Sequence, residues 1–378
     1  MKRRFIYVHF LFSLLAKNLP LIIRAGPRAL AHIRDHGLRA RDIEIIPGAA
    51  GGPKALGLQG LDVALFGEWL PSAPRVRHLV GASIGAWRFA SAAQKNPAHA
   101  LRRFAELYVA QHFPAPFDKH YVTQCCQEMV QALFAGNEND ILHHPYYRLS
   151  ILAVRGRGLL AQESRATLAA LALAATANSL HRGQLKHFFV RTVFHDVRAK
   201  TPLFYPGDNQ HDEKSFDAFH TDHIVASKEN LLSALLASGS IPLVLEGVTN
   251  IPAAPQGTYW DGGLIDYHID WPYHRAKGLV LYPHFTDKII PGWLDKSFPW
   301  RKAQGEWLDN VILISPSADY LARLPFGKLP DRSDFKKFVH DPAARMRYWN
   351  TAIAESERLG EAFLRLADQN DIEQIQPI

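Results

Sequence analysis

Short apolar runs alternate with longer segments of helical periodicity along most of the chain. Runs rich in β-branched and aliphatic residues predict strands at 43–46, 76–80, 150–154, 188–193, 223–225, 278–282 and 311–314. Apolar residues at helical spacing predict helices at 57–70, 98–111, 124–134, 164–178, 228–237 and 342–367. Because strands alternate with helices, we predict an α/β fold with a mainly parallel sheet flanked by helices.

The 378 residues could form one large domain or two modest ones. No internal repeat or low-complexity linker divides the chain. We predict a basic and apolar N-terminal extension at 1–41 and a main domain at 42–290. The remaining residues, 291–378, are predicted to add a strand and helices that pack on the same domain.

The N-terminus carries a tribasic start followed by an apolar run at 5–16. This pattern allows three interpretations: a packed or loosely structured extension, a membrane-surface anchor, or a cleaved signal. Lys17 and Pro20 interrupt the longer run to residue 23, which makes a transmembrane helix a poor fit. We therefore expect a protein that is cytoplasmic or peripheral to a membrane, with an N-terminal signal or anchor left open.

Composition excludes several classes of protein. With 47% hydrophobic and 21% charged residues, the chain is neither disordered nor collagen-like nor a coiled coil. Its net charge of +7 is scattered and is not interleaved with aromatic residues, so we expect no nucleic-acid partner. A basic surface also suits an anionic membrane. The two cysteines, Cys125 and Cys126, are adjacent and cannot form a disulfide scaffold.

A Gly-x-Ser-x-Gly motif stands at 81–85, where a predicted strand turns into a predicted helix. Gly81 and Gly85 permit a sharp turn without Cβ clashes, which presents the Ser83 hydroxyl at the carboxyl edge of the sheet. The free N–H groups at the start of the following helix stabilise developing negative charge. In this context we interpret Ser83 as a candidate nucleophile rather than part of a structural turn.

Two other glycine-containing segments could complete the chemistry of an activated serine. Residues 51–54, Gly-Gly-Pro-Lys, follow a predicted strand, and their backbone N–H groups could approach a substrate oxygen. Residues 261–263, Asp-Gly-Gly, place the carboxylate of Asp261 on a sharp turn, where it could accept a proton. Taken singly, each segment is also typical of an ordinary turn.

Together, the three segments resemble the patatin-like phospholipase family of serine lipid acyl hydrolases. The corresponding motifs of that family follow the same order along the chain: a glycine-rich loop, a Gly-x-Ser-x-Gly elbow and an aspartate motif. The resemblance covers about residues 43–267 and includes 233–242, which is similar to the family's helix and turn before the aspartate motif. Ala50 and Ala55 stand where the family's loop carries its outer glycines. The implied oxyanion-hole residues are Gly51, Gly52, Pro53 and Lys54, and the elbow and dyad-loop glycines are Gly81, Gly85, Gly262 and Gly263.

The resemblance implies a three-layer α/β fold and a Ser83–Asp261 dyad that works without a histidine, a metal or an organic cofactor. It further implies hydrolysis of carboxylic esters of lipids, with phospholipids or lysophospholipids as substrates. An acyltransferase that uses the same serine and a non-catalytic lipid-binding protein are the alternatives on this fold.

The histidines allow two other interpretations. A Ser-Asp-His triad could draw its histidine from the residues that follow Asp261 in the chain order of α/β-hydrolases. These candidates are His268, His274, His284 and His340. Metal binding through His143, His144, His220 and His223 lacks a characteristic ligand spacing, so we interpret these four as structural histidines.

Overall fold

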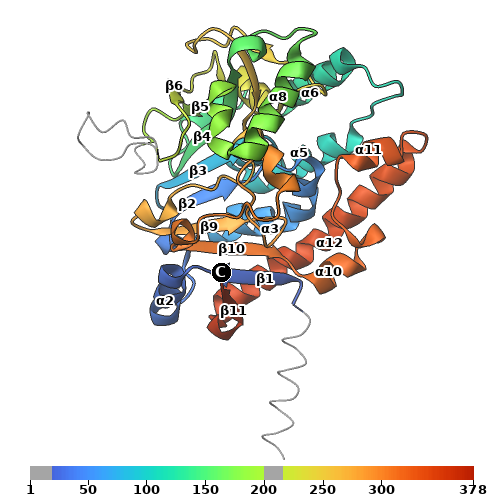
Figure 1. Cartoon of the computed structure of the whole chain (residues 1–378). Coiled ribbons are helices and arrows are strands. Elements are labelled where there is room, and N and C mark those ends of the chain that lie inside the picture. Colours follow the sequence, from blue (N-terminus) through green and yellow to red (C-terminus); the bar gives the residue numbers. More distant parts are fainter. Residues whose placement is uncertain (1–18, 200–215) are drawn as a thin grey trace, which may run out of the picture.

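The computed structural model describes residues 19–199 and 216–378 (Figure 1). The apolar run at 5–16, with its three interpretations, lies outside these residues. None of the helices in the described ranges is long and apolar enough to cross a membrane.

One mixed sheet forms the centre of the fold. Its strands in the described residues are β1 (Leu21–Ala25), β2 (Ile43–Gly48), β3 (Arg77–Ala82), β4 (Tyr147–Gly156), β5 (Phe189–His195), β6 (Thr221–Val225), β7 (Val248–Thr249), β8 (Thr258–Asp261), β9 (Leu279–Pro283), β10 (Val311–Pro316) and β11 (Ile375–Pro377). Their order is β11-β1-β10-β9-β2-β3-β4-β5-β6, with β8 paired to β4 and β7 paired to β8. The run from β10 to β4 is parallel. Every residue of β3 is buried, as expected for a parallel strand covered by helices on both faces.

Helices flank this sheet, and the longest of them, α12, lies beside α3 (Figure 1). The α-helices are α2 (Pro27–His36), α3 (Gln59–Ala64), α4 (Ile84–Ala92), α5 (Pro97–Ala110), α6 (Lys119–Phe134), α7 (Glu138–Leu142), α8 (Thr167–Leu180), α9 (Leu231–Gly239), α10 (Ala318–Arg323), α11 (Ser333–Lys337) and α12 (Pro342–Gln369). Short 3-10 or π segments connect them, among them η2 (Gly52–Leu58), η3 (Leu65–Trp69), η6 (Gly262–Leu264) and η8 (Trp293–Ser297). Helix α4 packs on β2 and β3, and α9 packs on β4 and β8.

This architecture confirms the predicted α/β fold, and each predicted strand overlaps an observed one. The sequence analysis did not predict β1, which lies inside the range assigned to an N-terminal extension. β1 pairs antiparallel with β10 and parallel with β11, so segments near both chain ends belong to the sheet. Its five residues continue an apolar run and include Arg24. The spacing of apolar residues does not by itself identify such a segment as a strand. The division into three ranges stays a prediction.

The strand register brings the candidate site together at one edge of the sheet. β4 residues 153–155 pair with β5 on one edge and with β8 on the other. That second edge of β4 pairs with β3 at residues 147–152, so β8 follows β3 along the same edge. β3 ends with Ala82 opposite Leu152, and β8 continues with Asp261 opposite Ala153. Because Ser83 directly follows β3, the pairing places it beside Asp261.

Candidate functional site

Ser83 forms a sharp turn between β3 and α4. Its backbone has φ +55° and ψ −129°, a conformation that costs energy for a residue with a Cβ atom. A Cβ on Gly81 would lie 2.5 Å from the backbone of Ala86, and a Cβ on Gly85 would lie 1.9 Å from the carbonyl oxygen of Gly48. The two glycines of the motif thus let α4 leave the strand at once and pack against the end of β2.

Gly85→Ala is expected to destabilise the fold by about 3 kcal/mol, because the added methyl group overlaps a backbone oxygen that cannot rotate away. Urea unfolding measures the loss. Gly305→Ala serves as the matched control, since a Cβ there meets nothing within 4 Å. Equal stability of the two variants would contradict the close approach of α4 to β2.

The side chains of Ser83 and Asp261 meet directly. Ser83 Oγ donates a hydrogen bond of 2.6 Å to Asp261 Oδ2, while Asp261 Oδ1 accepts one of 2.7 Å from the amide of Gly263. Both side chains are buried, with 3% of Ser83 and 5% of Asp261 exposed. The Gly263 amide fixes one carboxylate oxygen and leaves the other aimed at the hydroxyl.

Ser238, from the end of α9, ties the nucleophile turn to the sheet. Its hydroxyl accepts a hydrogen bond of 2.8 Å from the Ser83 amide and donates one of 2.6 Å to the carbonyl oxygen of Leu152. The carbonyl oxygen of Ser240 accepts a bond of 2.8 Å from the Asp261 amide. The segment 233–242, singled out only by resemblance, therefore contacts both members of the pair.

Burial raises the pKa of Asp261 above its usual value. The guanidinium of Arg332, the Ser83 hydroxyl and the Gly263 amide oppose this rise without cancelling it. A carboxylate with a raised pKa is a stronger base than an exposed one, which suits proton transfer from a hydroxyl.

The glycine loop borders the same space as Ser83. Gly52, at φ +57°, begins η2 and lines a cavity together with Ser83. Because η2 is a 3-10 helix with i→i+3 hydrogen bonds, its first bonded amide is that of Lys54, which pairs with the carbonyl oxygen of the N-cap Gly51, and the Gly52 N–H has no partner inside the helix. Pro53 has no N–H group and can contribute only to the shape of the loop. The loop thus places a backbone donor, the Gly52 N–H, in the segment that borders the cavity.

A cavity of about 590 Å³ opens at Ser83. Most of its lining is apolar, including Trp87, Phe113, Val122, Leu245 and Phe335. This volume lies within the range of pockets that hold small organic ligands. The cavity is therefore a mostly apolar pocket that has Ser83 in its lining.

Three cationic side chains near the pair come from separate parts of the chain. Arg332 Nη2 lies 4.0 Å from Asp261 Oδ2. The Lys54 ammonium lies 4.7 Å from the centre of the Phe285 ring, and that of Lys296 lies 4.3 Å from the centre of the Tyr267 ring. Sequence reasoning missed Arg332 and Lys296, because both lie outside the motifs and no local pattern marks them.

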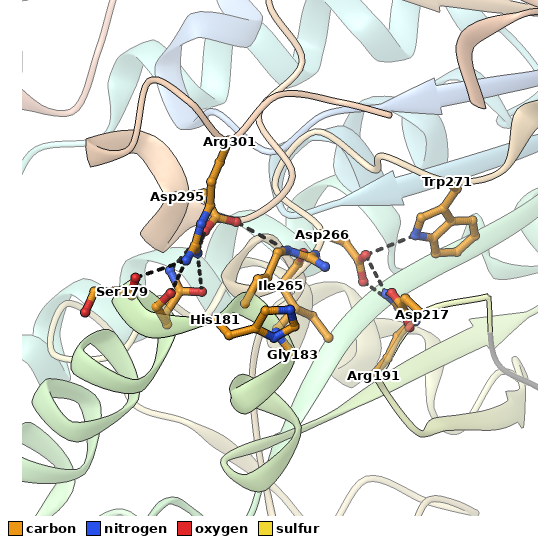
Figure 2. Close-up of polar contacts among 12 residues, drawn as sticks. Ser179, His181, Gly183, Arg191, Asp217, Ile265, Asp266, Trp271, Asp295 and Arg301 are labelled. Atoms are coloured by element: carbon orange, nitrogen blue, oxygen red, sulfur yellow. Dashed lines mark hydrogen bonds and ion pairs between the residues drawn. The ribbon is translucent and has the colours of Figure 1, made fainter. Parts of the chain in front are cut away.

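Two polar clusters support the turn that carries Asp261 (Figure 2). In the first, Arg191 pairs with Asp266 at 2.7 Å and Asp217 at 2.6 Å, and Asp266 also accepts from Trp271 Nε1. The Asp266 amide donates to the carbonyl oxygen of Gly262 at 2.9 Å, which connects this cluster to the turn.

The second cluster surrounds a buried carboxylate on η8. Asp295 accepts hydrogen bonds from Asn178 and Arg301 and forms an ion pair of 3.3 Å with Arg182. Arg182 also donates to the carbonyl oxygen of Ile265. Together the clusters hold the residues after the Asp-Gly-Gly turn from two sides.

The candidate histidines make their hydrogen bonds elsewhere: His268 Nδ1 contacts the carbonyl oxygen of Lys288, and His284 Nδ1 that of Thr286. No hydrogen bond recorded for the described residues joins a histidine to Ser83 or Asp261. His144 stacks on Tyr147, whereas His220 forms an ion pair with Asp222. Across ranges 19–199 and 216–378, no group of three or more His, Cys, Asp or Glu side chains is placed to hold a metal.

Comparison with known proteins identifies the family of this chain. No curated protein matches the chain. The sequence model of the patatin-like phospholipase family matches residues 58–268, more than half of the chain and a range that contains the serine turn and the aspartate turn. Members of this family are generally lipid acyl hydrolases. The mixed, mostly parallel sheet flanked by helices agrees with the fold of the family. The chain therefore belongs to the patatin-like phospholipase family.

Proposed function

We propose that this protein is a serine hydrolase that cleaves carboxylic esters of lipids, including phospholipids, with Ser83 as nucleophile and Asp261 as general base. The observation that carries the proposal is the 2.6 Å hydrogen bond from Ser83 Oγ to Asp261 Oδ2 at the end of an apolar cavity. A direct serine–aspartate contact favours a dyad over a triad with histidine.

In the first half of the reaction, Ser83 Oγ attacks the ester carbonyl carbon as its proton passes to Asp261. The oxygen of the tetrahedral intermediate becomes negative and is held by amides of the loop that contains Gly51 and Gly52, with the start of α4 adding its positive end. When the intermediate collapses, the alcohol leaves with the proton from Asp261, and the acyl group stays on Ser83.

In the second half, Asp261 takes a proton from water, and the hydroxide formed attacks the acyl-enzyme. The fatty acid leaves and Ser83 recovers its proton. This cycle needs no metal and no organic cofactor. Product analysis with an added alcohol distinguishes transfer to water from transfer to another acceptor.

The residues at the rim of the cavity favour a lipid substrate that enters from a membrane surface. Phe117, Leu243 and Val244 line the cavity and are also 43%, 52% and 46% exposed. Lys119 and Lys336 lie at the same cavity. Apolar side chains bordered by cations suit peripheral contact with an anionic membrane.

Labelling with a fluorophosphonate tests the nucleophile. An activated Ser83 should displace fluoride and carry the phosphonyl group, which mass spectrometry locates on the peptide that contains residue 83. Ser83→Ala should take up no label. Ser91→Ala is the control, because Ser91 is buried in the same helix and its hydroxyl donates to the carbonyl oxygen of Trp87. Folded wild type that stays unlabelled, even with liposomes, would contradict the proposal.

A further inference from the structure

Arg332 reaches the candidate site from a segment outside the family match, in the loop directly before α11. The buried carboxylate of Asp334 anchors this loop. It accepts hydrogen bonds from the Asp331 amide at 2.8 Å, Lys328 Nζ at 2.9 Å and Trp349 Nε1 at 3.1 Å. The backbone that carries Arg332 is thus held in place by contacts that do not involve its own side chain.

The guanidinium of Arg332 lies between the glycine loop and the dyad. Its Nε stands 2.9 Å from the position that a Cβ on Gly52 would take, and its Nη2 lies 4.0 Å from Asp261 Oδ2. The second distance is longer than a hydrogen bond. No hydrogen bond from the guanidinium is recorded within the described part of the chain, and the side chain is 37% exposed. Its N–H donors are therefore available to a bound molecule.

The surroundings of Arg332 carry an excess of positive charge. The charged side chains that line the cavity, Lys119, Arg332 and Lys336, are all cationic, and of these Lys119 is paired with the carboxylate of Glu163. Burial, together with repulsion from Lys54 and Arg332, lowers the pKa of Lys296 to about 8, although attraction to Asp261 and Asp331 opposes the fall. Such a site favours a ligand that brings negative charge.

We propose that Arg332 binds an anionic substituent, a phosphate or carboxylate near the scissile ester, and so sets a preference for lipid esters that carry one. This inference rests on the proposed function. The planar guanidinium presents paired donors that match the oxygens of either group. In a glycerophospholipid the phosphate lies only a few bonds from the ester carbonyl, which fits the small separation of Arg332 from Asp261 and Gly52.

Two short-chain substrates with the same acyl group test the preference: a monoacylglycerol phosphate and the corresponding monoacylglycerol. Arg332→Gln should reduce the ratio of their kcat/KM values by about 10- to 100-fold, the range for loss of charge-assisted hydrogen bonds. Arg332→Lys should restore part of the ratio. Lys337→Gln is the matched control, because it removes the same charge from the same segment, where the Lys337 ammonium lies over the Phe326 ring at 3.5 Å.

Equal losses on both substrates would overturn the proposal, since they would mean that Arg332 acts only through Asp261. A binding measurement separates this failure from failure of the proposed function. Calorimetry on Ser83→Ala should show that an ether-linked monoalkylglycerol phosphate binds at least about 10-fold more tightly than the monoalkylglycerol, and that adding Arg332→Gln removes the difference. Equal affinities would also overturn the proposal. If binding depended on Arg332 but the wild type did not turn over either substrate, the result would contradict the proposed hydrolase activity and leave the role of Arg332 in binding intact.

Discussion

Asp261→Asn is expected to lower kcat for ester hydrolysis by about 10²- to 10⁴-fold, the range for loss of a general base. Asparagine has the shape of aspartate, and its carbonyl oxygen can still accept the hydrogen bond from the Gly263 amide. In that orientation its NH₂ group faces Ser83 Oγ, where a proton acceptor is needed. The variant therefore keeps the geometry and loses the base. Initial rates on a short-chain ester, with urea unfolding alongside, measure the two effects separately.

The pH profile provides a second test of Asp261. Because burial raises the pKa of this carboxyl, wild-type activity should decline as the pH falls through the raised value and Asp261 takes up a proton. Asp261→Asn should lack this decline in its residual activity. Asp270→Asn is the control: burial raises the pKa of Asp270 to about 7, yet within the described residues the Ser83 hydroxyl bonds Asp261 and not Asp270. Wild-type rates in Asp261→Asn would show that another group accepts the serine proton.

The serine turn could be predicted from sequence because its constraints are local. A residue at positive φ between a strand and a helix needs small neighbours. Gly81 and Gly85 meet this requirement, and both are visible in the sequence as part of the motif. Strands β2 to β4 were predictable for a related reason, since each contains a short buried apolar run, at 45–46, 79–80 and 151–154. The fold class follows from these elements.

The contacts that complete the site depend on chain segments far apart in sequence. Arg332 lies beside Asp261 only because the loop before α11 packs there, and β1 joins the sheet only through β10 and β11. Neither arrangement leaves a periodic pattern or a motif. The pairing of Ser83 with Asp261 was expected from resemblance to a family; the strand register now supplies a geometric reason for their contact.

Arg191→Met is expected to destabilise the protein by about 3–5 kcal/mol, because breaking a buried ion pair leaves a charge without compensation. Arg191 is 1% exposed and neutralises both Asp266 and Asp217 (Figure 2). Burial acts to raise the pKa of Asp217, but attraction to Arg191 outweighs it and holds that pKa below its usual value. Methionine retains the volume but not the charge, so two carboxylates would remain in the interior. Urea unfolding at pH 8 measures the loss.

Acidification should reduce the deficit of Arg191→Met. Without the guanidinium, the effect of burial on the Asp217 carboxyl is less opposed, so its pKa in the folded state rises, and its protonation at lower pH restores stability to the variant. In wild type the contribution of Asp217 is instead lost as the pH falls through its lowered pKa. The wild-type loss falls below pH 5, because the pKa of Asp217 lies below the ordinary value of 3.8, so the variant alone changes between pH 8 and pH 5 and the difference at pH 5 should be smaller than at pH 8.

Neutralising the whole cluster distinguishes charge from packing. The triple variant Arg191→Met, Asp217→Asn, Asp266→Asn should recover much of the lost stability, because no buried charge is left unpaired. Arg155→Met removes a guanidinium whose pair with Asp222 is more exposed, and it should cost less. If the triple variant were as unstable as Arg191→Met, the loss would come from packing around the Asp261 turn. The Arg191 cluster would then hold that turn by shape rather than by charge.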